Sequence, residues 1–305
     1  MPKVTVERSV MINAPRGKVY ATVRDFHQWP EWSPWLICEP DAKLTFAKDG
    51  RKYTWDGQYI GSGEIAVIRE TEGVSIDYQL TFLKPFKSKA TARLEFANAG
   101  EQTKVTWKMD SSMPFFLFFL CGMMKNLIGM DYERGLLMLR NYVETGDRSC
   151  ALKFIGEESF SGFAYWGIRT KTTMKEVGPS MEKDFALLVE KMTTAGIEPS
   201  GAPFSIYHKW DIGKGKIDYT IGIPVNEGAT APADVLAGSI PDCRVYSIQH
   251  TGPYELLGNP WSALMTRQRA KAFHCSKLPP FETYANDPRE TKPEDLVTVV
   301  HYPLK

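Results

Sequence analysis

Regular alternation of apolar residues restricts the first half of this 305-residue chain to an antiparallel sheet. Every second residue is apolar, aromatic or glycine in four runs, at 53–59, 76–82, 90–96 and 105–109. Alternation with a period of two puts these residues on one face of a strand. Turns that contain glycine or proline separate the runs. The pattern predicts an antiparallel meander with one buried face.

A strand is expected before this meander and a long helix after it. Residues 4–12 alternate, and Asn13 and Pro15 then offer a cap and a first turn for a short helix. Near residue 130, five apolar residues recur at spacings of three and four: Ile128, Tyr132, Leu136, Leu139 and Val143. They form one apolar stripe on a helix. A curved sheet that grips this helix leaves a cavity where the inward side chains do not fill the space.

Three tryptophans and two prolines fall within residues 29–35. Proline fixes its own φ and biases the preceding residue toward extended backbone, so the segment is expected to be stiff and irregular. Trp29, Trp32 and Trp35 then either pack in the core or line a pocket with indole N–H donors. A run of apolar residues at 113–124, which includes Phe115, is expected to be either a lid over the cavity mouth or a buried helix.

These features resemble the SRPBCC (START-like, polyketide cyclase/dehydrase) superfamily. The segments that carry the resemblance are 12–15, 26–35, 61–63, 113–116 and 131–136. It covers nearly all of a first domain at 1–147 and implies a helix-grip fold with a deep hydrophobic pocket for a lipid-like or aromatic ligand. The candidate ligand contacts of this domain are Trp29, Trp32, Trp35 and Phe115.

The second half, 152–305, contains an internal repeat. Segment 197–207 is echoed by 277–284, and segment 221–225 is echoed by 300–304. Each copy reads strand, helix, strand, strand. Two such units related by a pseudo-two-fold axis give one sheet backed by two helices, with a groove between the halves as the natural ligand site. The fold class is therefore α+β in both halves.

The second copy resembles the GyrI-like small-molecule-binding domain, which is also the effector-binding part of some bacterial transcription regulators. The resemblance rests on 252–255, Trp261 and 281–288. It implies a cleft in which aromatic residues and an acidic group accept planar or cationic organic molecules. Carried over by position, the ligand contacts are Tyr207, Tyr254, Trp261, Glu282 and Tyr284.

One position departs from the family pattern. The last strand often carries an acidic residue four positions before its proline, where this chain has Val299. A cationic ligand would then need Glu282 or Glu255 as its anchor. Glu282 is also a candidate catalytic residue, as a cleft acid that could place a water molecule. His250 could act as a general base near pH 7, although no paired nucleophile or orienting acid lies at motif spacing.

Composition excludes several classes of function. The 37 basic and 36 acidic residues nearly cancel, which argues against nucleic acid as a direct partner. Phosphate-binding, zinc-protease and serine-hydrolase motifs are absent from the sequence. The five cysteines are odd in number and form no CxxC pair, which favours a reducing cytoplasm over a disulfide framework or a zinc site. Neither a signal peptide nor a membrane span is expected, and the histidines show no metal-ligand spacing.

Three kinds of function remain. The first is a cytoplasmic, bacterial-type protein that binds or senses hydrophobic or aromatic small molecules in one or both pockets, with no cofactor. The second is a hydrolase or cyclase that acts on reactive aromatic natural products through a cleft glutamate and aromatic walls. The third is a ligand-responsive regulator that acts through a protein partner. Binding is favoured because no residue set forms a recognisable catalytic constellation.

Overall fold

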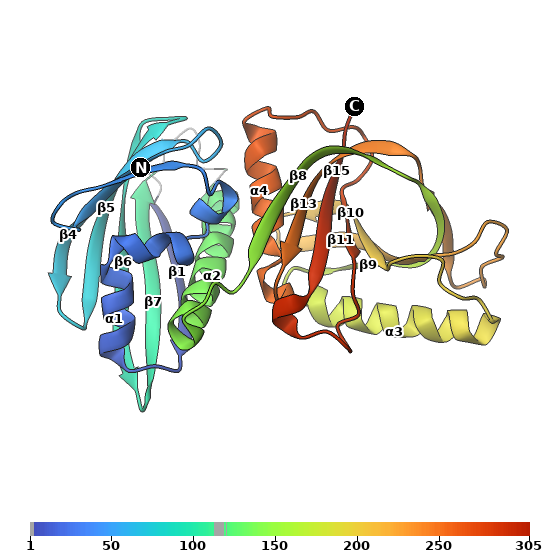
Figure 1. Cartoon of the computed structure of the whole chain (residues 1–305), viewed down its shortest axis with the longest axis horizontal. Coiled ribbons are helices and arrows are strands. Elements are labelled where there is room, and N and C mark those ends of the chain that lie inside the picture. The colour runs from blue at the N-terminus through green and yellow to red at the C-terminus, as the bar shows by residue number, and fades with distance from the viewer. Residues whose placement is uncertain (1–2, 113–118, 120) are drawn as a thin grey trace. The chain divides into compact units, whose positions relative to one another are not determined.

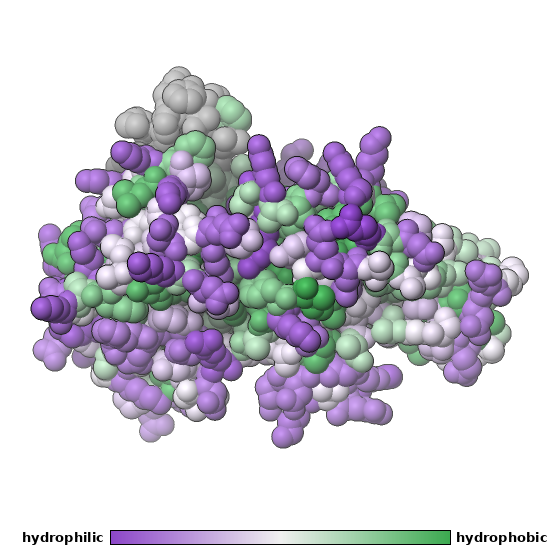
Figure 2. Space-filling view, turned by 45° about the horizontal axis from the view of Figure 1, so that its top comes forward, coloured by the Kyte–Doolittle hydropathy of each residue, from purple (hydrophilic) through white to green (hydrophobic). Residues whose placement is uncertain are grey.

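The computed structural model describes residues 3–112, 119 and 121–305. The chain divides into two compact units, one holding Met1–Ser149 with Met265–Ala270 and the other holding Cys150–Leu264 with Lys271–Lys305. Phe115 and most of the apolar run at 113–124 to which it belongs lie outside the described residues. No helix of the described part is long and apolar enough to cross a membrane. Figure 2 shows one face of the molecule, on which hydrophilic side chains are interspersed with hydrophobic ones.

The first unit is a seven-stranded antiparallel sheet with a long helix (Figure 1). Its strand order is β1-β7-β6-β5-β4-β3-β2, and α2 packs mainly against β1. The elements are β1 (Lys3–Ile12), α1 (Arg16–Arg24), η1 (Phe26–Glu31), η2 (Leu36–Cys38), β2 (Lys43–Phe46), β3 (Lys52–Asp56), β4 (Ser62–Thr71), β5 (Ser75–Lys84), β6 (Ser88–Ala99), β7 (Gln102–Ser112) and α2 (Cys121–Thr145). The helix-grip arrangement predicted from the alternation is confirmed.

Two local expectations for this unit are wrong. The alternation at 53–59 ends early, because β3 stops at Asp56 and a turn follows. The buried carboxylate of Glu39 holds that turn by accepting the backbone N–H groups of residues 58, 59 and 60 at 2.7–2.9 Å. Asn13 does not cap α1, whose N-cap is Pro15. The backbone N–H of Asn13 instead donates to Glu144 at 2.6 Å.

The second unit is an eight-stranded antiparallel sheet with two main helices. Its strand order is β12-β9-β11-β10-β14-β15-β13-β8. The elements are β8 (Ala151–Phe160), β9 (Phe163–Thr173), α3 (Val177–Ala195), β10 (Phe204–Asp211), β11 (Lys216–Pro224), β12 (Leu236–Ile240), β13 (Cys243–Thr251), η4 (Tyr254–Leu256), α4 (Gly258–Arg269), β14 (Phe281–Tyr284), η5 (Pro293–Asp295) and β15 (Val297–Pro303).

The internal repeat predicted from the sequence is visible in this strand order. One copy is β9-α3-β10-β11 and the other is β13-α4-β14-β15. The spatial orders β9-β11-β10 and β14-β15-β13 are mirrored about the β10–β14 pair, as a pseudo-two-fold axis requires. Edge strands β12 and β8, which the repeat did not predict, extend the sheet on either side.

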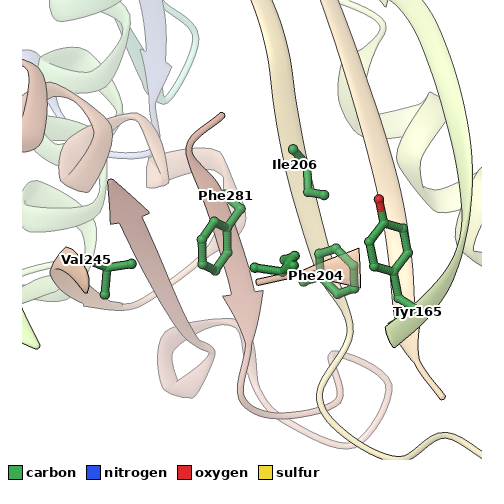
Figure 3. Packing of buried hydrophobic residues seen from close by; sticks show 6 residues of the cluster. Tyr165, Phe204, Ile206, Val245 and Phe281 are labelled. Carbon is green, nitrogen blue, oxygen red and sulfur yellow. The ribbon is translucent and has the colours of Figure 1, made fainter. Parts of the chain in front are cut away.

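The two faces of this sheet have different roles. One face carries a buried cluster that continues across both copies (Figure 3) and consists of Tyr165, Phe204, Ile206, Ile240, Val245 and Phe281. Successive residues of a strand point to opposite faces, so Ser205 and Glu282, which follow Phe204 and Phe281, belong to the other face. Helix α3 packs on β9 and β11, and ring contacts connect both helices to this second face.

Candidate functional site

A buried carboxylate lies where the two copies of the repeat meet. Glu282 on β14 has only 1% of its surface exposed. Its Oε1 accepts hydrogen bonds from the hydroxyl groups of Tyr207 at 2.5 Å and Tyr284 at 2.6 Å. Its Oε2 accepts a hydrogen bond from the indole N–H of Trp261 at 2.9 Å. Four residues predicted from the sequence as ligand contacts therefore form one hydrogen-bonded cluster, which we call the Glu282 cluster.

Strand register explains why these side chains meet. Ser205 of β10 pairs directly with Glu282 of β14, and residues two apart on a strand share a face. Tyr207 and Tyr284 therefore lie on the same face as the carboxylate. Trp261 reaches the carboxylate from the first turn of α4. The pairing of the two central strands thus builds the cluster from both copies.

The pseudo-symmetry is broken at one position. The segment 204–207 corresponds to 281–284, which places Ser205 in the first copy where the second copy has Glu282. The Ser205 hydroxyl lies 2.9 Å from the Tyr284 hydroxyl, and this contact mirrors the one between Glu282 and Tyr207. The centre of the sheet therefore carries one carboxylate and not two.

Burial controls the protonation of the cluster. Removal from water raises the pKa of the Glu282 carboxyl above its ordinary value, although the three hydrogen bonds it accepts favour the charged form and oppose that shift. Burial and the nearby carboxylate also raise the pKa of Tyr207 and of Tyr284 well above the usual range. Both tyrosines therefore keep their protons and act as donors. Within 3–112, 119 and 121–305, no ion pair includes Glu282.

Aromatic rings pack against the Glu282 cluster on two sides. On one side Trp261 packs edge-on against Tyr207 and Trp210, with ring centroids 4.8 and 5.3 Å apart. On the other side Tyr284 receives the edges of Phe185 and Tyr254, each with a centroid distance of 5.8 Å. Tyr254 is partly exposed, at 37%, and so marks the side of the cluster that reaches solvent.

The sequence reasoning missed Trp210 and Ser205 as members of this site. Strict alternation puts Trp210 on the face opposite Tyr207, but a register shift between Tyr207 and Lys209 returns it to the same face, where it stacks on Tyr207 at 5.8 Å. A bulge of this kind leaves no clear signal in the sequence. The repeat itself could have indicated Ser205, because it occupies the position equivalent to Glu282.

Neither position 299, where the family often has an acidic residue, nor Glu255 contributes a carboxylate to the Glu282 cluster. Val299, at the position where the family often has an acid, pairs with Thr283 and so lies on the face opposite Glu282. Glu255 lies in η4 and is exposed. Among the described residues, no group of three or more His, Cys, Asp or Glu side chains could hold a metal ion.

The tryptophans of the first unit form a connected aromatic cluster. Trp29 and Trp32 are buried, and their ring centroids lie 4.7 Å apart. The ring centroid of Trp32 lies 5.7 Å from that of Trp107 of β7. Trp107 stacks on Tyr132 of α2 at 4.1 Å. Trp35 is half-buried and packs edge-on against Trp107. Phe115, the fourth predicted contact, lies outside the described residues.

Several donors of this aromatic cluster have no acceptor. Trp29 donates to the carbonyl of Val23 at 2.8 Å, and Trp35 donates to Asp131 at 3.1 Å. By contrast, three buried groups find no partner in the described part of the unit: Trp32 Nε1, Trp107 Nε1 and the Tyr78 hydroxyl. Buried polar groups are rarely left without a hydrogen bond. Three buried donors of the first unit are therefore unsatisfied by the described residues.

Two family models match the chain. Residues 3–144 match the model described as polyketide cyclase / dehydrase and lipid transport. Residues 158–305 match the model described as GyrI-like small molecule binding domain. A comparison with curated proteins gave no match.

Solved structures resemble parts of the chain. The EcmrR C-terminal domain is 18% identical, with 51% of this chain and 96% of that chain covered and a TM-score of 0.44. The Aha1 dimer from Colwellia psychrerythraea is 14% identical, with 47% and 98% covered and a TM-score of 0.36. A START superfamily protein from Mycobacterium smegmatis is 21% identical, with 46% and 97% covered and a TM-score of 0.34.

The two family models confirm the two resemblances inferred from the sequence. The chain joins a domain of the polyketide cyclase/dehydrase and lipid transport family, at residues 3–144, to a GyrI-like small-molecule-binding domain, at residues 158–305.

Proposed function

We propose that the GyrI-like domain binds planar aromatic cations, and that Glu282 supplies the negative charge that selects them. The observation that carries this proposal is a buried carboxylate that accepts three neutral hydrogen bonds and has no cationic partner among the described residues. This function is binding or sensing, in a cytoplasmic protein, and needs no cofactor.

The energetics of charge burial favour a cationic ligand. A buried ionised carboxylate loses its hydration, at an effective cost of several kcal/mol, unless an opposite charge compensates it. Neutral donors such as Tyr207, Tyr284 and Trp261 compensate only part of this cost. A ligand cation would supply the missing charge. The surrounding indole and phenol rings would add cation–π attraction, because their faces are electron-rich.

Catalysis is the second candidate, and one observation favours it. The raised pKa of Glu282 means that a larger fraction of this carboxyl keeps its proton near neutral pH than is usual for glutamate. Such a group can donate a proton to a reactive ligand as a general acid. No nucleophile or orienting base accompanies Glu282 in its hydrogen bonds, so binding remains the preferred function.

The test compares a cation with a neutral molecule of nearly the same shape. Isothermal titration calorimetry on the intact chain at pH 8 would measure 1-methyl-4-phenylpyridinium against neutral 4-phenylpyridine. We expect the cation to bind more tightly. Glu282→Gln should weaken the cation by about 30-fold or more, because loss of one partner of a buried charge pair costs roughly 2 kcal/mol or more. Binding of the neutral molecule should change little.

Glu198→Gln is the matched control, because Glu198 is an exposed glutamate of the same domain. Equal affinities for the two molecules, or equal effects of the two substitutions, would contradict the proposal. Mass spectrometry of the incubated ligands tests the second candidate at the same time. A product that depends on Glu282 would assign an enzyme.

For the first domain we propose an apolar ligand that carries an oxygen acceptor. The unpartnered donors Trp32, Trp107 and Tyr78 support this proposal, since a carboxylate or carbonyl oxygen would satisfy them. An apolar body suits the aromatic surroundings. A cationic head would leave the three donors unsatisfied, because it offers no hydrogen-bond acceptor.

Dodecanoate and dodecyltrimethylammonium provide the test, because they share one tail and differ in the head group. We expect dodecanoate to bind more tightly to the intact chain in a fluorescence titration. Tyr78→Phe should weaken dodecanoate by about tenfold or more, because one hydrogen bond to a charged group contributes roughly 1.5 kcal/mol or more. Tyr142→Phe, at a half-buried tyrosine of α2, should have no effect. Preference for the cationic head, or equal effects of both substitutions, would contradict this assignment.

A further inference from the structure

Two neighbouring polar side chains of the GyrI-like domain are fully buried and have no partner. His250 on β13 and Thr298 on β15 are both 0% exposed. Both ring nitrogens of His250 and the Oγ1 of Thr298 lack a hydrogen bond within the described ranges. A buried polar group without a partner costs roughly 1–3 kcal/mol. Three such atoms on two residues that are paired across neighbouring strands therefore destabilise the free protein, and a bound group that formed hydrogen bonds with them would remove this cost.

Strand register puts these residues beside the Glu282 cluster. His250 pairs directly with Thr298 between β13 and β15, and Thr298 pairs directly with Tyr284 between β15 and β14. Directly paired residues lie on the same face, with Cβ atoms about 5 Å apart. Tyr284, Thr298 and His250 thus form a row across three strands. Tyr284 donates to Glu282 from one end of this row.

The chemistry of the two side chains defines the missing group. Burial lowers the pKa of His250 to about 4, so the imidazole is neutral near pH 7. A neutral imidazole has one donor and one acceptor nitrogen, and the threonine hydroxyl can take either role. The complementary group must itself both donate and accept. A hydroxyl group meets this requirement, whereas a charged group would meet no opposite charge there.

We propose that His250 and Thr298 form a neutral polar subsite of the same binding site, which receives a hydroxyl group of the ligand whose cationic end lies at Glu282. This inference rests on the function proposed above. Neighbouring strands lie about 4.8 Å apart, so His250 is roughly 10 Å from Tyr284. The ligand hydroxyl should therefore lie about two aromatic rings from the cation.

Two pyridinium probes that differ in one hydroxyl test the subsite. The parent is 1-methyl-4-phenylpyridinium, and the second probe carries a hydroxymethyl group at the far end of its phenyl ring. We expect the second probe to bind the intact chain about five- to tenfold more tightly, as one or two new hydrogen bonds would give. Thr298→Val and His250→Phe should each remove most of that gain and leave the affinity of the parent unchanged.

Matched controls separate the subsite from a general effect on folding. Thr298→Val should not lower the melting temperature, because the hydroxyl it removes has no partner in the free protein. Thr283→Val changes a threonine of the neighbouring strand whose side chain bonds to His301 on the opposite face. It should preserve the gain from the hydroxyl group.

The outcomes distinguish this inference from the function on which it rests. If the parent binds and the hydroxyl adds nothing, a tightly held water fills the subsite and the inference fails alone. It fails alone as well if the gain survives both Thr298→Val and His250→Phe, or if Thr283→Val removes it equally. If neither probe binds, the proposed function fails and the subsite fails with it.

Discussion

A single glutamate distinguishes the two otherwise similar halves of the GyrI-like domain. The repeat gives each half a Phe-x-x-Tyr segment on a central strand, but only the second half has a carboxylate, at Glu282, where the first has Ser205. Both tyrosines donate hydrogen bonds toward this one charge. The result is one carboxyl group held by neutral donors at the centre of the sheet, and the cation site that we propose rests on this arrangement.

The raised pKa of Glu282 makes a prediction about stability. Folding raises the pKa of this carboxyl above its ordinary value of 4.5. Below pH 4.5 the carboxyl is protonated in both the folded and the unfolded state, so it does not lower the free energy of unfolding. Its contribution falls as the pH rises through the folded pKa. Glu282→Gln should therefore gain stability relative to the native chain between pH 4.5 and pH 8.

Urea unfolding of both proteins at several pH values measures this difference. The buried histidines 250 and 301, each with a pKa lowered to about 4 by burial, titrate in both proteins and cancel. Glu198→Gln should show no such trend. A stability difference that is constant with pH would show that Glu282 carries no unfavourable buried charge.

Most of the second site could be predicted from the sequence and the family resemblance together, because the repeat aligns Tyr207 with Tyr284 and the family pattern selects Glu282 and Trp261. The structure brings these four together. Trp210 could not be predicted, because its placement depends on a backbone bulge that the residue types do not encode. The lack of hydrogen bonds at the ring nitrogens of His250 could not be predicted either, because it depends on the positions of all the side chains packed around the ring.

At the scale of elements, periodicity predicted the long features and missed the short ones. The helix stripe near residue 130 became α2, and three of the four alternating runs became β5, β6 and β7. Strand β2 has only four residues, which is too short for a period to be distinguished from chance. The end of β3 depends on Glu39, about twenty residues away in sequence, whose carboxylate binds the turn.

The close packing of neighbouring elements around Gly63 could not be predicted from the sequence either. Gly63 is the second residue of β4, which lies between β3 and β5. A Cβ at this position would lie 2.5 Å from the Trp55 ring and 2.6 Å from the Thr81 carbonyl oxygen. The sequence marks this glycine as part of a turn. The structure assigns it a different reason, which is the close approach of an indole ring and a neighbouring strand.

At the scale of the whole molecule, the chain carries two families of small-molecule domain in sequence, each with its own interior. The groups that we propose as ligand contacts differ in kind between the two domains. The first domain presents neutral donors that suit an oxygen acceptor, and the second presents a carboxylate that suits a cation. The nearly equal numbers of basic and acidic residues give no field that would favour one ligand over the other. In the functions we propose, ligand selectivity therefore arises inside each domain.

The most direct test of this account is the titration of Glu282 itself, by carbon-13 NMR of its carboxyl in the intact chain. The resonance is assigned by its absence in Glu282→Gln and is followed with and without saturating 1-methyl-4-phenylpyridinium. Because binding and protonation are reciprocally linked, a bound cation must favour the ionised carboxyl. We predict a pKa above the ordinary value in the free protein and a decrease of about one unit or more on binding. A pKa that stays unchanged or rises when the cation binds would contradict the account.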